Sequence, residues 1–231
     1  MKKLFSALCL ILILSYSAFS GGDVMNSAGD KAVLFHFNGL SNLSAGSFMS
    51  TNSMSIGSVD FPSFQAIGMK YYFSDGFAGR GALLLGYNSE TVKSGSGGFS
   101  DQKESSFGIG LELGIQSDFV KSGSFVGYLG ALAGFALLSG TYEPSVANPP
   151  PAGTATKYYA SVTNFGIGGL LGFDYFIYNR ISLGAEYQFG IVFGSGTYEI
   201  TRQALPTTTQ DLPSQMSLGF NTVSFKLAAY F

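Results

Sequence analysis

Apolar and polar residues alternate along most of this chain with a period of two. From residue 181 to 194, the odd positions are Ile181, Leu183, Ala185, Tyr187, Phe189, Ile191 and Phe193, and the residues between them are mostly small or polar. Successive side chains of a strand point to opposite faces, so this pattern predicts a strand with one apolar face. Residues 107–115 repeat it. Alternating segments of about ten residues separated by turns are typical of membrane β-barrels.

The same alternation predicts eight strands, at residues 32–42, 63–73, 77–89, 105–116, 124–141, 158–177, 181–199 and 215–231. Long connections (43–62, 90–104, 142–157 and 200–214) alternate with short ones (74–76, 117–123 and 178–180). This alternation is typical of an antiparallel up-and-down transmembrane barrel with long loops outside the cell and short turns in the periplasm. The polar 200–214 segment, with Pro206 and Pro213, is predicted to be a mobile loop.

For two of the predicted strands, the sequence does not show which face is the apolar one along the whole strand. Both parities of 124–141 are apolar, so no face can be assigned there. In the last strand the apolar parity changes between Phe220 and Val223. A β-bulge near Asn221 would reconcile the two halves of that strand.

The first twenty residues have the features of a secretory signal peptide. Lys2 and Lys3 precede an apolar stretch at 4–13, and Ala18 and Ser20 give a small-x-small cleavage pattern. We therefore expect a signal peptide over 1–20 and one barrel domain over 21–231. Cys9, the single cysteine, would leave with the signal peptide, so no disulfide or thiolate site is expected.

Composition narrows the class of protein further. Charged residues make up 11% of the chain, against about 25% in soluble domains. Without Lys2 and Lys3 the remaining chain has 10 basic and 14 acidic residues. This chain therefore has no basic excess that would attract nucleic acid.

Six charged residues lie inside the predicted strands, each on the polar face: Lys70, Arg80, Glu112, Asp174, Glu186 and Lys226. A soluble lipocalin-type barrel turns its apolar face inward. Such a barrel would carry many charges on its outer polar face, whereas here that face is mostly Gly, Ala and Ser. We therefore expect the apolar face to contact lipid. The lumen of eight strands is just wide enough for side chains to fill. The three cations and three carboxylates are predicted to plug it as a network of ion pairs.

Residues 68–87, which include Lys70 and Arg80, resemble small bacterial outer-membrane β-barrel domains of the OmpA and OmpX type. So do residues 182–187 and the terminal Phe231. The resemblance implies location in a Gram-negative outer membrane. It also implies that Phe231 is the residue read by the barrel-assembly machinery.

Candidate chemistry is sparse. His36 is the only histidine and lies at an inward position of its strand, where it could be a ligand, a base or a hydrogen-bonded lumen residue. One histidine and no mature cysteine give no metal-ligand spacing. The glycine clusters at 95–98 and 166–169 complete no nucleotide-binding motif. We expect no catalytic residue, no metal and no cofactor.

Three functions remain open from the sequence. The first is a non-enzymatic outer-membrane barrel with a structural role or a role in recognition and adhesion through its loops. The second is a narrow or gated porin-like channel controlled by the lumen charges. The third is a lipid-modifying enzyme that uses His36. The expected partners are membrane lipid and lipopolysaccharide, the assembly machinery and an extracellular ligand at the loops, without nucleic acid.

Overall fold

The computed structural model describes residues 25–37, 55–56, 58–62, 64–94 and 98–231, and the expected signal peptide lies outside them. Eight antiparallel strands close into a barrel in the order β1-β10-β9-β8-β7-β6-β5-β4, which confirms the predicted fold class. They are β1 (Lys31–Phe37), β4 (Gln65–Ser74), β5 (Phe77–Val92), β6 (Gln102–Ser122), β7 (Phe125–Glu143), β8 (Ala155–Tyr178), β9 (Ile181–Arg202) and β10 (Leu205–Tyr230). A small separate sheet pairs β2 (Ser55–Ile56) with β3 (Val59–Asp60).

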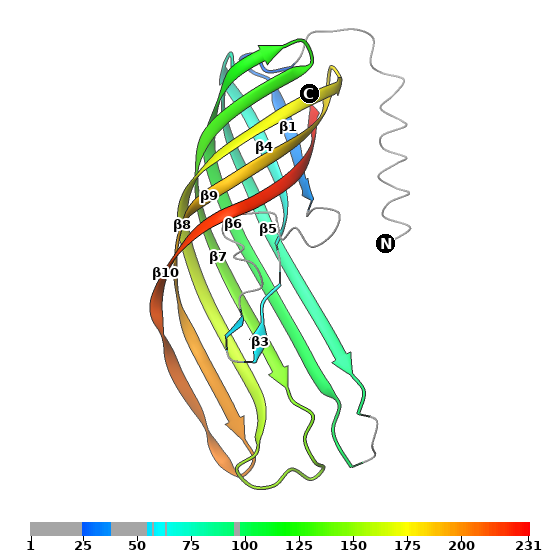
Figure 1. Ribbon diagram of the computed structural model, residues 1–231, viewed down its shortest axis with the longest axis vertical. Coiled ribbons are helices and arrows are strands. Elements are labelled where there is room, and N and C mark those ends of the chain that lie inside the picture. The colour runs from blue at the N-terminus through cyan, green and yellow to red at the C-terminus, as the bar shows by residue number, and fades with distance from the viewer. Residues whose placement is uncertain (1–24, 38–54, 57, 63, 95–97) are drawn as a thin grey trace.

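The barrel has two different ends (Figure 1). At the turn end, tight connections at 75–76, 123–124 and 179–180 join neighbouring strands, and Gly76 and Gly123 have the positive φ that such turns require. At the loop end the connections are residues 93–101, 144–154 and 203–204. Strands β5 to β10 run far toward the loop end, at the bottom of Figure 1, whereas β4 is short and the described part of β1 ends at Phe37. No helix in the described part of the chain is long and apolar enough to cross a membrane.

Strands β5 to β10 are longer than the sequence pattern predicted, and the 200–214 loop prediction was wrong. Residues 38–42 of the first predicted strand lie outside the described part of the chain. Residues 200–202 belong to β9 and residues 205–214 to β10, so the connection shrinks to 203–204, and Gln210 lies opposite Tyr198. Register shifts occur between Leu205 and Thr208 and between Leu212 and Gln215, the two places that contain Pro206 and Pro213. A proline cannot donate to a ladder, so an irregularity at each one lets the pairing continue on both sides.

The other predicted connections also become shorter. The 117–123 turn is mostly strand, and the 90–104 and 142–157 loops shrink to 93–101 and 144–154. Of the predicted 43–62 loop, residues 43–54 lie outside the described part, and β2 and β3 form within the rest. A register shift between Gly219 and Thr222 confirms the bulge predicted in the last strand. In β7 the structure assigns the open faces: Tyr128 and Leu132 are buried, and Leu129 is exposed.

The outward face carries an apolar belt with a sharp edge. On β6 the belt consists of Phe107, Ile109, Leu111, Leu113 and Ile115, each 38–55% exposed. The belt spans nine residues of β6, 107–115, which matches the length of a tilted strand that crosses a bilayer. Tyr87 pairs with Phe107, and the next outward pair is Ser89 with Ser105. The outward side of β9 likewise changes from Phe193 to Ser195 and Thr197. Beyond the belt the wall therefore continues as a polar extension.

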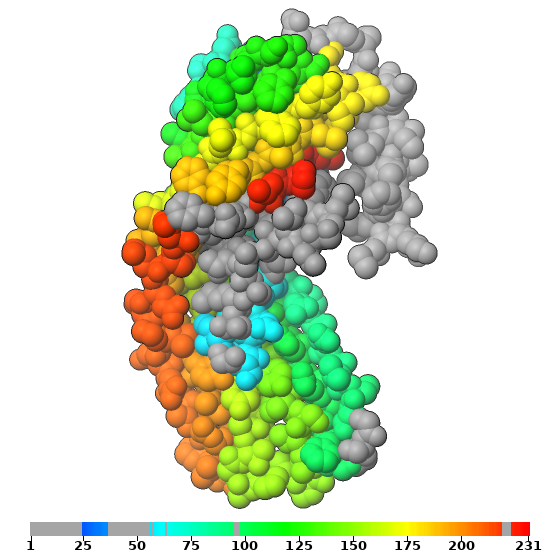
Figure 2. Space-filling view, in the orientation of Figure 1, coloured from blue at the N-terminus to red at the C-terminus, as the bar shows by residue number. Residues whose placement is uncertain are grey.

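Along the same direction, from turn end to loop end, the inward face loses its charged residues and becomes apolar. Toward the turn end it holds buried charges, which are described below, together with a separate buried cluster that includes Leu34, Tyr72 and Phe176. Toward the loop end it is lined by apolar side chains, among them Leu84, Leu132, Ala136, Leu138, Val162 and Val192. Val59, Phe61 and Phe64 pack against these residues from a segment, 55–64, that is separate from the wall over most of its length; we call it the plug segment. The cyan atoms of β2 and β3 lie in the trough formed by the long strands in Figure 2.

Candidate functional site in the lumen

The structure places all six charges singled out in the sequence on the inward face, with Lys70, Glu112, Asp174, Glu186 and Lys226 at most 3% exposed and Arg80 7% exposed. They come from six different strands: β4, β5, β6, β8, β9 and β10. Strand alternation alone directs each side chain inward, because its neighbours in sequence take the outward positions.

Arg80 and Glu186 form the tightest pair. Both terminal guanidinium nitrogens of Arg80 donate to the carboxylate of Glu186, at 2.7 and 3.0 Å. Gln188 donates a further hydrogen bond of 2.7 Å to Glu186 Oε1. A two-pronged contact of this kind fixes both partners and is stronger than a single hydrogen bond.

Asp174 lies between two lysines. Lys70 Nζ is 3.2 Å from Asp174 Oδ2, and Lys226 Nζ is 3.0 Å from Asp174 Oδ1. Lys226 is also 3.9 Å from Glu186 Oε2, so it links the two carboxylates. Tyr230 donates a 3.3 Å hydrogen bond to Asp174 Oδ2. Opposite charges at these separations compensate part of the large cost of removing each ion from water.

The hydroxyl of Tyr128 connects the two groups of ion pairs. It accepts a 2.6 Å hydrogen bond from Lys226 and donates one of 3.1 Å to Glu186 Oε2. A Cβ added at Gly172 would lie 2.5 Å from this hydroxyl, so only glycine leaves room for the ring. Lys226 Nζ also lies 4.4 Å from the centre of the Tyr128 ring, within the range of a cation–π contact.

Glu112 lies beside Arg80. Arg80 is opposite Gly114, and Ala82 is opposite Glu112, so the two charges occupy neighbouring inward positions of β5 and β6. Glu112 is one of the charges that act electrostatically on Arg80. The six charges thus form one continuous group together with Tyr128, Gln188 and Tyr230.

Sequence reasoning placed Gln188 on the lumen face but did not include it in the predicted network, and it missed Tyr128 and Tyr230. Tyr230 has the same parity as Lys226, and Gln188 the same as Glu186, so a parity rule applied to all polar side chains would have found them. Tyr128 could not be found in this way, because both faces of its strand are apolar in sequence. Tyr72, with the parity of Lys70, is also buried in the lumen.

His36 lies on the inward face of β1, opposite Lys226, and is 3% exposed. Neither ring nitrogen has a hydrogen-bond partner among the described residues. No serine–histidine hydrogen bond is therefore formed in that part of the chain. Within the same residues, no group of three or more His, Cys, Asp or Glu is arranged to hold a metal ion.

The plug segment forms a second layer of contacts in the lumen, nearer the loop end. Val59 and Phe64 are completely buried. A Cβ added at Gly140 of β7 would clash with Val59 Cγ1, and one at Gly108 of β6 would lie 2.7 Å from the Phe64 ring. These two glycines allow the plug segment to lie directly against the wall.

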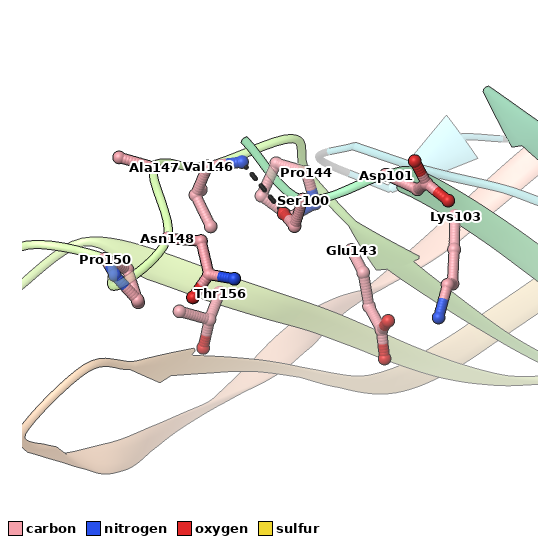
Figure 3. A pocket seen from close by; sticks show the side chains of 10 residues that line it. All are labelled: Ser100, Asp101, Lys103, Glu143, Pro144, Val146, Ala147, Asn148, Pro150 and Thr156. Carbon is pink, nitrogen blue, oxygen red and sulfur yellow. Dashed lines mark hydrogen bonds between the residues drawn. The ribbon is translucent and has the colours of Figure 1, made fainter. Parts of the chain in front are cut away.

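A polar cleft of about 360 Å³ lies at the loop end between the 93–101 and 144–154 connections (Figure 3). Ser100 N donates to Val146 O at 2.8 Å, and Asn148 N donates to Gly98 O at 2.9 Å, so the two loops are held together. Lys103 and Glu143 line the cleft. Asp101 also lines it and accepts a 2.8 Å hydrogen bond from Lys93, which lowers the pKa of that carboxyl.

Comparison with known proteins gives limited information. No family model matches the chain, and no curated protein matches it in sequence. The crystal structure of the outer membrane protein OprG from Pseudomonas aeruginosa is similar with a TM-score of 0.48 at 14% identity, over 90% of this chain and 99% of that one. The solution structure of the E. coli Outer Membrane Protein W is similar with a TM-score of 0.39 at 15% identity, over 90% of this chain and 100% of that one. Similarity this low assigns neither a family nor a function, and the OmpA/OmpX-type resemblance stays a prediction.

Proposed function

We propose that this chain is an integral outer-membrane barrel with a closed lumen, which supports the membrane or presents its polar extension for recognition. The observation that carries the proposal is the apolar belt. Its outward Leu, Ile and Phe side chains are about half exposed over nine positions of β6, and a row of serines and threonines ends it. Such a band is costly in water and favourable in lipid.

Closure of the lumen follows from two independent layers of side chains. The charges around Arg80 and Asp174 fill the lumen toward the turn end, and the plug segment fills it toward the loop end. An eight-stranded wall leaves little space beyond what such side chains occupy. In this proposal the wall and the loop-end cleft, rather than a pore, carry the function.

The proposed partners follow from the two outer surfaces. Lipid acyl chains would cover the belt, and lipopolysaccharide or an extracellular ligand would meet the polar extension and the cleft beside Lys103. Phe231 is proposed as the residue read during assembly. Its backbone completes the seam through hydrogen bonds with Lys31, and its side chain is 56% exposed.

A gated channel is the second candidate, and a specific observation favours it. The plug segment fills the loop-end half of the lumen, and most of it, β2 and β3 included, is not paired into the wall. Movement of this segment would open the loop-end half of the lumen as far as the ion-pair group. The lipid-modifying enzyme has no comparable support, because His36 is buried and makes no hydrogen bond with a described serine.

Conductance of the refolded protein in a planar bilayer distinguishes the two candidates. We expect no steady open channel from the parent protein and brief openings from Glu186→Ala, which shortens a side chain of the ion-pair group. Gln210→Ala, on the polar extension, is the matched control and should behave as the parent. A parent protein with a large, permanently open conductance would contradict the closed-lumen proposal and favour the channel.

A further inference from the structure

Residues 25–30, which we call the N-terminal strap, run across the turn end of the barrel before β1 begins. Gly29 N donates to Tyr72 O at 2.9 Å, and Tyr72 N donates to Asp30 O at 2.9 Å, so the strap is hydrogen-bonded to the end of β4. Gly76 N donates to Asn26 O at 3.1 Å, and Ala28 N donates to Asp75 Oδ1 at 3.0 Å. The strap is therefore tied to the β4–β5 turn as well as to β4.

Two side chains of the strap lie at the mouth of the lumen. Met25 packs against the cluster of buried residues that fills the turn end, formed by Ala32, Leu34, Tyr72, Ala78, Val126, Phe176, Ala228 and Tyr230. Asn26 is 5% exposed. A terminal segment without such contacts would be frayed, so these contacts fix the strap in one position.

Asp118 joins the strap to the lumen. Its Oδ2 accepts hydrogen bonds from Asn26 Nδ2 at 3.3 Å and from the Tyr72 hydroxyl at 3.5 Å. Its Oδ1 accepts one from Gln116 Nε2 at 3.3 Å. Tyr72 and Gln116 are buried side chains of the lumen wall, so a single carboxylate connects the strap with both.

We propose that the N-terminal strap is a closure of the turn-end mouth, held by Asp118, that keeps water and solutes away from the buried ion pairs. Met25 covers the apolar cluster, and the Asn26–Asp118 hydrogen bond holds Met25 in place. This closure uses other residues than the ion-pair group, except for Tyr230, which belongs to both. It is also independent of the plug segment, which lies toward the other end.

Access of a small thiol reagent to a lumen cysteine tests the closure. Ser182 is completely buried and lies near the turn end, so Ser182→Cys is a nearly isosteric reporter in a chain that also carries Cys9→Ser. The rate of reaction with a methanethiosulfonate is measured on the folded protein in lipid vesicles permeable to the reagent. Met25→Gly, Asn26→Ala and Asp118→Ala should each increase the rate at least tenfold, whereas Asp211→Ala at the loop end should not.

Two results would overturn the closure. One is a reporter that already reacts in the parent background as fast as an exposed cysteine at Thr91. The other is an increase in Asp118→Ala that neither strap variant reproduces, because this would mean that the wall, and not the strap, had been disturbed. Thermal unfolding by circular dichroism verifies that each variant is folded. A conductance result against the closed-lumen proposal leaves this measurement interpretable, because it reports access from the turn end alone.

Discussion

Two stretches of the same strand, β8, bury opposite kinds of side chain. Near the turn end, Asp174 points into the lumen while Phe173 and Tyr175 are 42% and 55% exposed on the outside. Near the loop end, Val162 is buried in the lumen and Ser161 and Thr163 take the outward positions. The backbone pairing is continuous between the two stretches.

This inversion shows that strand alternation does not fix which face is apolar. The medium outside the wall decides it. A membrane barrel places apolar residues outward, and a soluble barrel places them inward. Along the belt this wall places apolar residues outward, as the first rule states, and beyond the belt, at Ser161 and Val162, it follows the second rule. The two rules predict different consequences for the same kind of substitution in the two regions.

Removal of a lumen charge should have the largest effect. Glu186→Ala leaves Arg80 without its two-pronged partner and should cost about 3–5 kcal/mol in the fully buried limit. Val192→Ala, on the inward face of the loop-end half of the same strand, leaves no unpaired charge and should cost less. Urea unfolding in lipid vesicles measures both. Equal losses would mean that the charges are not desolvated as the structure indicates.

A charge on the outward face should distinguish belt from extension on a single strand. Leu111→Arg faces the belt and should lose about 2–4 kcal/mol if it lies near the bilayer midplane. Ser105→Arg, six residues along the same face of β6, should change the free energy of unfolding by about 0.5 kcal/mol or less, as surface substitutions do. If both variants were tolerated equally, the belt would not be in lipid.

The packing of the plug segment against the wall should be sensitive to the addition of a single methyl group. Gly140→Ala would place a Cβ against Val59 Cγ1 and should cost about 1–3 kcal/mol through overpacking. Val59→Ala removes that methyl. The double variant should therefore lose less unfolding free energy than the sum of the losses in the two single variants. A double-mutant cycle measures this coupling, and strict additivity would argue against the contact.

The smallest expected effect is a pH dependence at the loop end. The hydrogen bond from Lys93 lowers the pKa of Asp101, so its contribution is present above the ordinary aspartate value and is lost as the pH falls through the lowered one. Asp101 also accepts a 3.0 Å hydrogen bond from Ser94 N. Between pH 6 and pH 2, the Ser94 amide should lose protection from hydrogen exchange while amides of the belt do not. Asp101→Asn should abolish this difference between the two pH values.

The alternation of apolar and polar residues was sufficient to predict the number of strands in the barrel, the antiparallel fold and the inward direction of residues such as Glu186. The extent of the strands could not be predicted. Thr207, Thr208 and Thr209 have the composition of a loop, and they are strand because β9 supplies hydrogen-bonding partners and the prolines fall at register shifts. Pairing across strands is a tertiary effect, which local composition does not record.

For the candidate site, too, one part could be predicted from the sequence and another part could not. Charged residues inside apolar strands stand out in sequence, but the partner of each depends on barrel closure. Arg80 pairs with Glu186, which lies more than one hundred residues later in the chain. The plug segment was missed because Val59, Phe61 and Phe64 show no clear period, and their burial depends on the wall that surrounds them.

The pairing of the first strand with the last has a consequence for how the barrel assembles. Among the described residues β1 forms six pairs with β10, whereas β9 forms nineteen with that strand. The six join opposite ends of the chain, as in Ala32 with Tyr230, so forming them requires the closure of a very long loop. The neighbouring hairpins, in contrast, are local. We expect the hairpins to form first and the β1–β10 seam last, and the same seam to be the first part of the ring to separate when the barrel unfolds.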